Sequence, residues 1–103
     1  MSFKVAKEIT AQEVLHRINK GESLYMVDVR EPAEWEEGHI AGAKHIPLGQ
    51  IGERMNEINP EQETIVICRS GNRSGLACEL LSERGYSVVN MVGGMMAWEG
   101  DIE

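Results

Sequence analysis

Two short runs of almost uninterrupted apolar residues constrain the fold of this chain more than any other feature. They cover residues 24–29 and 64–67, and each has the length of a β-strand rather than of a helix. Strands of this kind occur where helices cover both faces of a sheet. Because amphipathic segments with helical spacing flank both runs, the sequence predicts an α/β fold with a mostly parallel sheet, helices on both faces and right-handed crossovers.

Capping residues place the first helices. Thr10 and Glu13 form a capping-box pair, which predicts a helix from residue 11 that Gly21 ends. Pro32 favours the first turn of a second, short helix, and Gly38 closes it.

The rest of the chain continues the alternation of strands and helices. A further helix is expected after Cys68, with Ala77, Leu80 and Leu81 on its apolar side. Shorter patterns predict three more elements: an edge strand at residues 45–46, a helix with apolar positions 48, 51, 55 and 58, and a strand at residues 87–89.

Length and charge exclude several classes of protein. The chain has 103 residues, which suffices for one core, so we expect a single domain over residues 1–103. The formal net charge is −7, and this field repels nucleic-acid phosphates and anionic membrane surfaces. No apolar run approaches the roughly 20 residues of a membrane span, and the first eight residues lack a signal peptide's apolar stretch. These features predict a cytoplasmic protein that binds neither nucleic acid nor membranes.

The segment after the second apolar run carries the residues that could perform chemistry. It reads Cys68-Arg69-Ser70-Gly71-Asn72-Arg73-Ser74. The backbone N–H groups of such a loop can form an anion-binding nest, and the helix that follows adds partial positive charge. Together with Arg69 and Arg73, this environment lowers the pKa of a thiol, so we predict that Cys68 is a nucleophile. A structural role for Cys68 as a small apolar residue is the alternative.

The sequence resembles the rhodanese-like sulfurtransferase family from about Ile9 to Trp98. Five motifs carry the resemblance: Asp28-Val29-Arg30-Glu31; Gly38-His39-Ile40-Ala41-Gly42-Ala43 with Ile46-Pro47; the segment from Cys68 to Ser74; Gly85-Tyr86; and Gly93-Gly94 with Trp98. The chain is similar to the single-domain form of the family. This resemblance implies a rhodanese-like three-layer domain with a central sheet of about five strands.

The resemblance also implies a ping-pong transfer of sulfur through a persulfide on Cys68. The donor would be thiosulfate or a similar small molecule, and the acceptor cyanide or a thiol. In the cell, a thioredoxin-like or biosynthetic protein could accept the sulfur. The loop residues are expected to bind the substrate: Arg69, Ser70, Gly71, Asn72, Arg73 and Ser74. No cofactor or metal is expected, because the cysteines and histidines lack metal-site spacing.

Three charged residues near the loop have structural interpretations. Asp28 and Arg30 end the first apolar run, so they should lie on the same rim of the sheet as Cys68. We expect them to support the site from behind rather than to take part in catalysis. Arg73 could bind substrate, but we favour an inward orientation in which it pairs with an acid such as Asp28 and holds the loop.

The same loop sequence is compatible with other functions. A persulfide carrier or a sulfur-sensing binding module would have the same loop. A cysteine phosphatase or arsenate reductase would require arginine six residues after the cysteine, and Ser74 occupies that position. Cys78 is expected to be a buried helix residue, with a resolving thiol as the alternative.

Overall fold

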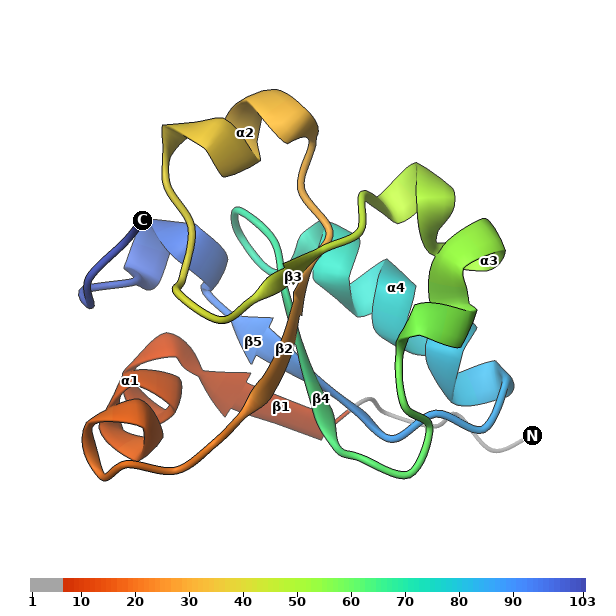
Figure 1. Cartoon of the computed structure of the whole chain (residues 1–103), viewed down its shortest axis with the longest axis horizontal. Coiled ribbons are helices and arrows are strands. Elements are labelled where there is room, and N and C mark those ends of the chain that lie inside the picture. Colours follow the sequence, from red (N-terminus) through yellow and green to blue (C-terminus); the bar gives the residue numbers. More distant parts are fainter. Residues whose placement is uncertain (1–6) are drawn as a thin grey trace.

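A parallel sheet forms the centre of the computed structural model, which describes residues 7–103 (Figure 1). Its five strands are β1 (Lys7–Thr10), β2 (Tyr25–Asp28), β3 (Lys44–His45), β4 (Thr64–Ile67) and β5 (Val88–Val92). Their spatial order is β1-β5-β4-β2-β3, and every pairing between neighbours is parallel. The predicted α/β fold is therefore confirmed, with the two apolar runs as neighbouring strands near the middle of the sheet.

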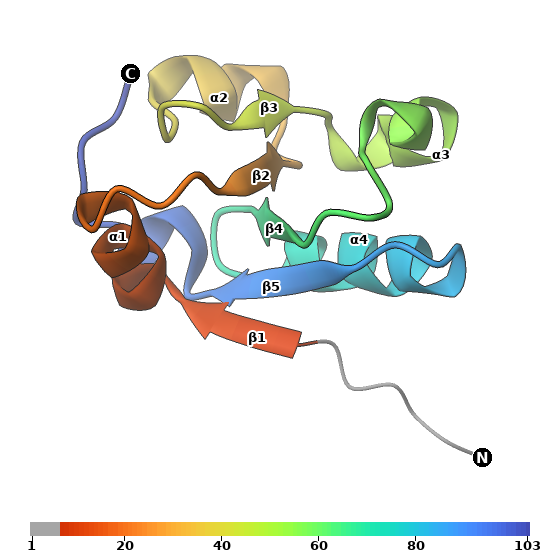
Figure 2. The same cartoon turned by 60° about the horizontal axis from the view of Figure 1, so that its bottom comes forward.

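The helices lie on both faces of this sheet (Figure 2). They are α1 (Ala11–Asn19), α2 (Pro32–Glu37), α3 (Ile51–Arg54) and α4 (Asn72–Glu83), with 3-10 turns η1 (Leu48–Gln50), η2 (Met55–Glu57) and η3 (Gly94–Ala97). As predicted, the Thr10 side chain caps α1 by accepting a hydrogen bond from the Glu13 backbone N–H. Within residues 7–103, none of the helices combines the length and the apolar character needed to cross a bilayer.

The two-residue repeat of the strands divides the core into two halves. Along β4, Ile65 and Ile67 pack on one face with residues of α1, whereas Val66 packs on the other with residues of α4. Cys68 continues this alternation, so its side chain lies on the α4 face. The alternation along β4 therefore directs the Cys68 thiol toward α4, independently of the contacts within the loop.

Three features differ from the predictions. Strand β1 was not predicted: Ile9 is the one buried residue of its four, and pairing with β5 holds it in the sheet. The helix expected between residues 48 and 58 is broken into η1, α3 and η2, because Gly49 and Gly52 weaken its helical propensity. Leu80 is 42% exposed, so it does not belong to the apolar side of α4 as expected.

Candidate active site

Cys68 lies directly after β4, at the N-terminal end of α4. Its side chain is 1% exposed. The Gly71 backbone N–H donates a hydrogen bond to Cys68 Sγ at 2.9 Å, and Ser74 Oγ lies 3.2 Å from the same sulfur. Gly71 has a φ of 107°, a left-handed conformation that lets the chain turn from the loop into α4. The loop thus folds its own polar groups onto the sulfur.

These contacts decide the ionisation of the Cys68 thiol. Burial alone raises its pKa, because it takes water away from the charged form. The Ser74 hydroxyl and the backbone N–H groups of Ser74, Gly71 and Ser70 outweigh burial by stabilising the thiolate. The net result is a Cys68 pKa below the ordinary value, as the loop sequence predicted.

The Gly93-Gly94 motif holds the loop from the opposite side. The backbone N–H of Met95 donates to the Cys68 carbonyl, and that of Met96 donates to the Arg69 carbonyl, both at 2.9 Å. A Cβ atom at Gly94 would lie only 2.5 Å from the Cys68 carbonyl oxygen. Glycine is therefore required at position 94 for this close approach of two backbones.

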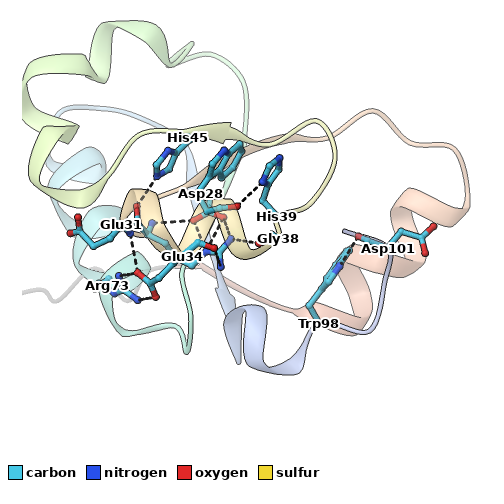
Figure 3. Close-up of polar contacts among 11 residues, drawn as sticks. Asp28, Glu31, Glu34, Gly38, His39, His45, Arg73, Trp98 and Asp101 are labelled. Carbon is cyan, nitrogen blue, oxygen red and sulfur yellow. Dashed lines mark hydrogen bonds and ion pairs between the residues drawn. The ribbon is translucent and has the colours of Figure 1, made fainter. Parts of the chain in front are cut away.

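A buried ion pair supports the rim next to the loop (Figure 3). Asp28 is fully buried, and its Oδ2 accepts from Arg30 Nη2 at 2.8 Å. Arg30 also donates to the backbone carbonyls of Glu34 at 3.2 Å and Gly38 at 2.8 Å. Asp28 and Arg30 therefore join the end of β2 to the middle and the C-terminal end of α2. Both residues lie on the rim beside the loop, and their support of the site stays a prediction.

Arg73 pairs with an acid, but not with Asp28, whose carboxylate Arg30 occupies. Instead, Arg73 makes a bidentate contact with Glu34 of α2, with N–O distances of 2.6 and 2.8 Å (Figure 3). The hydrogen bond from Arg73 lowers the pKa of Glu34 from 4.5 to about 2. The sequence offered no sign of this partner, because 39 residues separate the two side chains. The contact ties the start of α4 to α2.

A cavity of about 230 Å³ adjoins the loop. Its lining residues are Arg30, Glu34, Glu37, Arg69, Met95 and Met96. Arg30 is bound to Asp28, whereas the exposed Arg69 makes no ion pair within residues 7–103. Arg69 therefore brings an uncommitted positive charge to this cavity.

The structure also places three further residues from the sequence analysis. Ser70 is exposed on the loop, and Asn72 is exposed at the first position of α4. Cys78 is fully buried, as expected, and burial together with the nearby Cys68 charge raises its pKa to about 12. Within residues 7–103, the His, Cys, Asp and Glu side chains form no group of three or more that could hold a metal ion.

Asn90, which was not predicted to belong to the site, lies in β5 and is 7% exposed. Its Oδ1 accepts a hydrogen bond from Ser74 Oγ, and its Nδ2 donates to the Gly71 carbonyl at 3.1 Å. One polar residue within the apolar sequence of β5 was the signal that could have revealed it.

Comparison with known proteins identifies the family. The profile of the rhodanese-like domain matches residues 10–101, so this chain belongs to the rhodanese-like domain family. A sulfurtransferase of Allochromatium vinosum is 38% identical over 95 residues, which cover 91% of this chain and 89% of that protein. YtwF of Bacillus subtilis is 46% identical over 95 residues, with 92% of each chain covered.

Two further similarities concern activity and fold. The thiosulfate sulfurtransferase PspE of Escherichia coli is 40% identical over 73 residues, which are 69% of this chain and 70% of that protein. The crystal structure of a rhodanese-like domain protein from Staphylococcus aureus superposes with a TM-score of 0.88 at 35% identity. The superposition covers 94% of this chain and 96% of that one.

Proposed function

We propose that this protein is a thiosulfate sulfurtransferase that carries a sulfane sulfur on Cys68. The observation that carries the proposal is the position of Cys68 Sγ, which accepts a hydrogen bond from the Gly71 N–H at a helix N-terminus. Its lowered pKa supplies thiolate, which is the nucleophilic form of cysteine. The similarity to sulfurtransferases, including one named for thiosulfate, supports the same reaction.

In the first half of the cycle, the Cys68 thiolate attacks the outer sulfur of thiosulfate. A sulfur–sulfur bond forms to Cys68, the sulfur–sulfur bond of thiosulfate breaks, and sulfite leaves with the electron pair. The product is an anionic persulfide on Cys68. Backbone N–H groups of the loop stabilise this anion, and Arg69 attracts the dianionic donor to the cavity.

In the second half, an acceptor attacks the outer sulfur of the persulfide. Cyanide leaves as thiocyanate, and a thiol would leave as a persulfide; either reaction restores the Cys68 thiolate. Two displacements at sulfur thus replace one direct exchange. In the cell, a thiol, a thioredoxin-like protein or a biosynthetic protein would accept the sulfur. The cycle requires reduced thiols, which fits a cytoplasmic protein. Residues 1–103 would form the single module that carries out the cycle.

The loop geometry favours sulfur transfer over phosphatase or arsenate reductase activity. A tetrahedral oxyanion needs a wider loop closed by an arginine that clamps its oxygens. Here Ser74 occupies the position of that arginine, and its hydroxyl contacts Cys68 Sγ. Arg73, one residue earlier, is bound to Glu34 in a bidentate pair.

Intact-mass measurement tests the proposal directly. The reduced protein, Cys68→Ser and Cys78→Ser are each treated with thiosulfate, and cyanide is then added for a thiocyanate assay. We expect a gain of one sulfur atom in the unmodified protein and in Cys78→Ser, but none in Cys68→Ser. Cyanide should remove the adduct. Absence of an adduct on the unmodified protein would refute thiosulfate transfer, and an adduct that cyanide cannot discharge would indicate a carrier instead.

A further inference from the structure

Asn90 is linked to the candidate nucleophile, Cys68, through one intermediate side chain, that of Ser74. In β5, Val88 packs on the α4 side of the sheet, and the two-residue repeat directs Asn90 to the same side. Asn90 Oδ1 meets Ser74 Oγ, which in turn lies 3.2 Å from Cys68 Sγ. All three residues are buried. Because buried polar groups are shielded from solvent, they depend on hydrogen-bond partners within the protein.

The orientation of the Asn90 amide is fixed by its second partner. Asn90 Nδ2 lies 3.1 Å from the backbone carbonyl oxygen of Gly71, which can only accept hydrogen bonds. The NH₂ end of the amide must therefore face Gly71. The carbonyl end, Oδ1, must then face Ser74, where it can only accept.

Ser74 has a single hydroxyl proton and two groups that can take it. When the Ser74 hydroxyl donates to Asn90 Oδ1, its oxygen can only accept from the Cys68 S–H group. When Cys68 loses its proton to solvent, the thiolate can only accept, so the Ser74 proton has to turn toward sulfur. Asn90 Oδ1 is then left buried without a donor, which costs free energy.

We propose that Asn90 is a positioning residue that competes with the Cys68 thiolate for the Ser74 proton and thereby favours the persulfide over the empty thiolate. In the persulfide, Sγ is bonded to a second sulfur and the negative charge lies on that outer atom. Sγ no longer needs the Ser74 proton, so the hydroxyl returns to Asn90. The part that concerns the persulfide rests on the proposed function, whereas the part that concerns the thiolate does not.

The test uses variants that change Asn90 and Ser74 separately. Asn90→Leu keeps a side chain branched at Cγ and removes the competing acceptor, so the Cys68 thiolate should become more stable. At a pH below the Cys68 pKa, we expect roughly tenfold faster alkylation by iodoacetamide, which corresponds to about 1.4 kcal/mol, because the thiolate then keeps the Ser74 hydrogen bond without competition. Ser74→Ala should slow alkylation by a similar factor. Thiolate absorbance in the ultraviolet, measured against pH, reports the same shifts independently.

The double variant separates positioning from a general structural effect. In a Ser74→Ala background, Asn90→Leu should leave the alkylation rate unchanged, because Asn90 acts only through the Ser74 proton. Asn90→Asp is a second test: its carboxylate holds the Ser74 proton more strongly and should slow alkylation. Thr64→Val is the matched control, since Thr64 is a buried polar residue at the opposite end of β4, and its alkylation rate should equal that of the unmodified protein.

Slower alkylation in Asn90→Leu would overturn the inference, as would an equal effect of Asn90→Leu with and without Ser74. The persulfide part is measured at a fixed ratio of thiosulfate to sulfite. The fraction of Cys68 that carries sulfur should fall in Asn90→Leu and remain unchanged in Thr64→Val; an unchanged fraction in Asn90→Leu would overturn this part. If the unmodified protein forms no persulfide, the proposed function fails, whereas the alkylation test still decides whether Asn90 competes for the Ser74 proton.

Discussion

Glu34→Gln is the most informative single substitution in α2, because it removes the charge that holds Arg73 and nearly preserves the side-chain volume. The bidentate pair with Arg73 joins α2 to the start of α4, directly behind the loop of Cys68. We expect Glu34→Gln to lower the free energy of unfolding at neutral pH. It should also loosen the loop and slow the alkylation of Cys68.

The magnitude follows from the pKa of Glu34. The fall from 4.5 to about 2 corresponds to roughly 3 kcal/mol, at about 1.4 kcal/mol for each pKa unit. This is an upper limit, because the side chains of Glu34 and Arg73 remain 23% and 32% exposed and solvent screens their attraction. After this reduction we expect a loss of about 1–2 kcal/mol.

The pH dependence gives the sharpest test. Because folding lowers the pKa of Glu34, its stabilisation is fully present above about pH 4.5 and is lost as the pH falls toward 2. The stability difference between the unmodified protein and Glu34→Gln, measured by urea unfolding, should therefore shrink over this interval. Glu57→Gln is the matched control, since Glu57 has a pKa of about 2 through Arg54 and Lys44 but lies in an exposed pair. Equal effects of the two substitutions, or no dependence on pH, would refute the reasoning.

Three further substitutions or measurements test other parts of the site. Asp28→Asn leaves the Arg30 guanidinium buried without its counter-charge and should lower the free energy of unfolding by about 3–5 kcal/mol, measured with urea; a loss below 1 kcal/mol would contradict this. Gly94→Ala forces the Cys68 loop away and should lower kcat/KM for thiosulfate about 100-fold, so normal kinetics would show that the close approach is dispensable. Native protein at pH 8 should be alkylated rapidly at one thiol, with Cys78 reacting only after denaturation; two fast thiols would disprove this assignment.

Local signals in the sequence were sufficient to predict much of the fold. The Thr10 cap, Pro32 at the start of α2, and the apolar run of β4 each depend on neighbouring residues, so they could be predicted without the tertiary structure. Strand β1 could not be predicted in this way. It contains Lys7 and Glu8, and it is a strand because it pairs with β5, about 80 residues later in the chain.

In the candidate site, too, features that depend on neighbouring residues could be predicted, whereas features that depend on tertiary contacts could not. The position of Cys68 between a strand and a helix was predicted correctly, because the alternation of elements and the loop sequence are local patterns. Arg73 pairs with an acid, as predicted, but this acid is Glu34 and not the suggested Asp28, because the choice between them depends on how α2 packs against the loop. Asn90 could only be understood once the register of β5 placed it beside Ser74.

The charges around the cavity show why the loop's backbone matters more than its arginines. Arg30 is bound to Asp28 and Arg73 to Glu34, so each of these positive charges is balanced by a carboxylate. Arg69 alone among the three makes no ion pair within residues 7–103, in a protein whose formal net charge is −7. A persulfide anion on Cys68 therefore depends mainly on the backbone N–H groups of the loop for its stabilisation. A tetrahedral oxyanion would in addition need an arginine that clamps its oxygens, and Arg73 is already bound to Glu34, which supports the assignment of sulfur transfer to this loop.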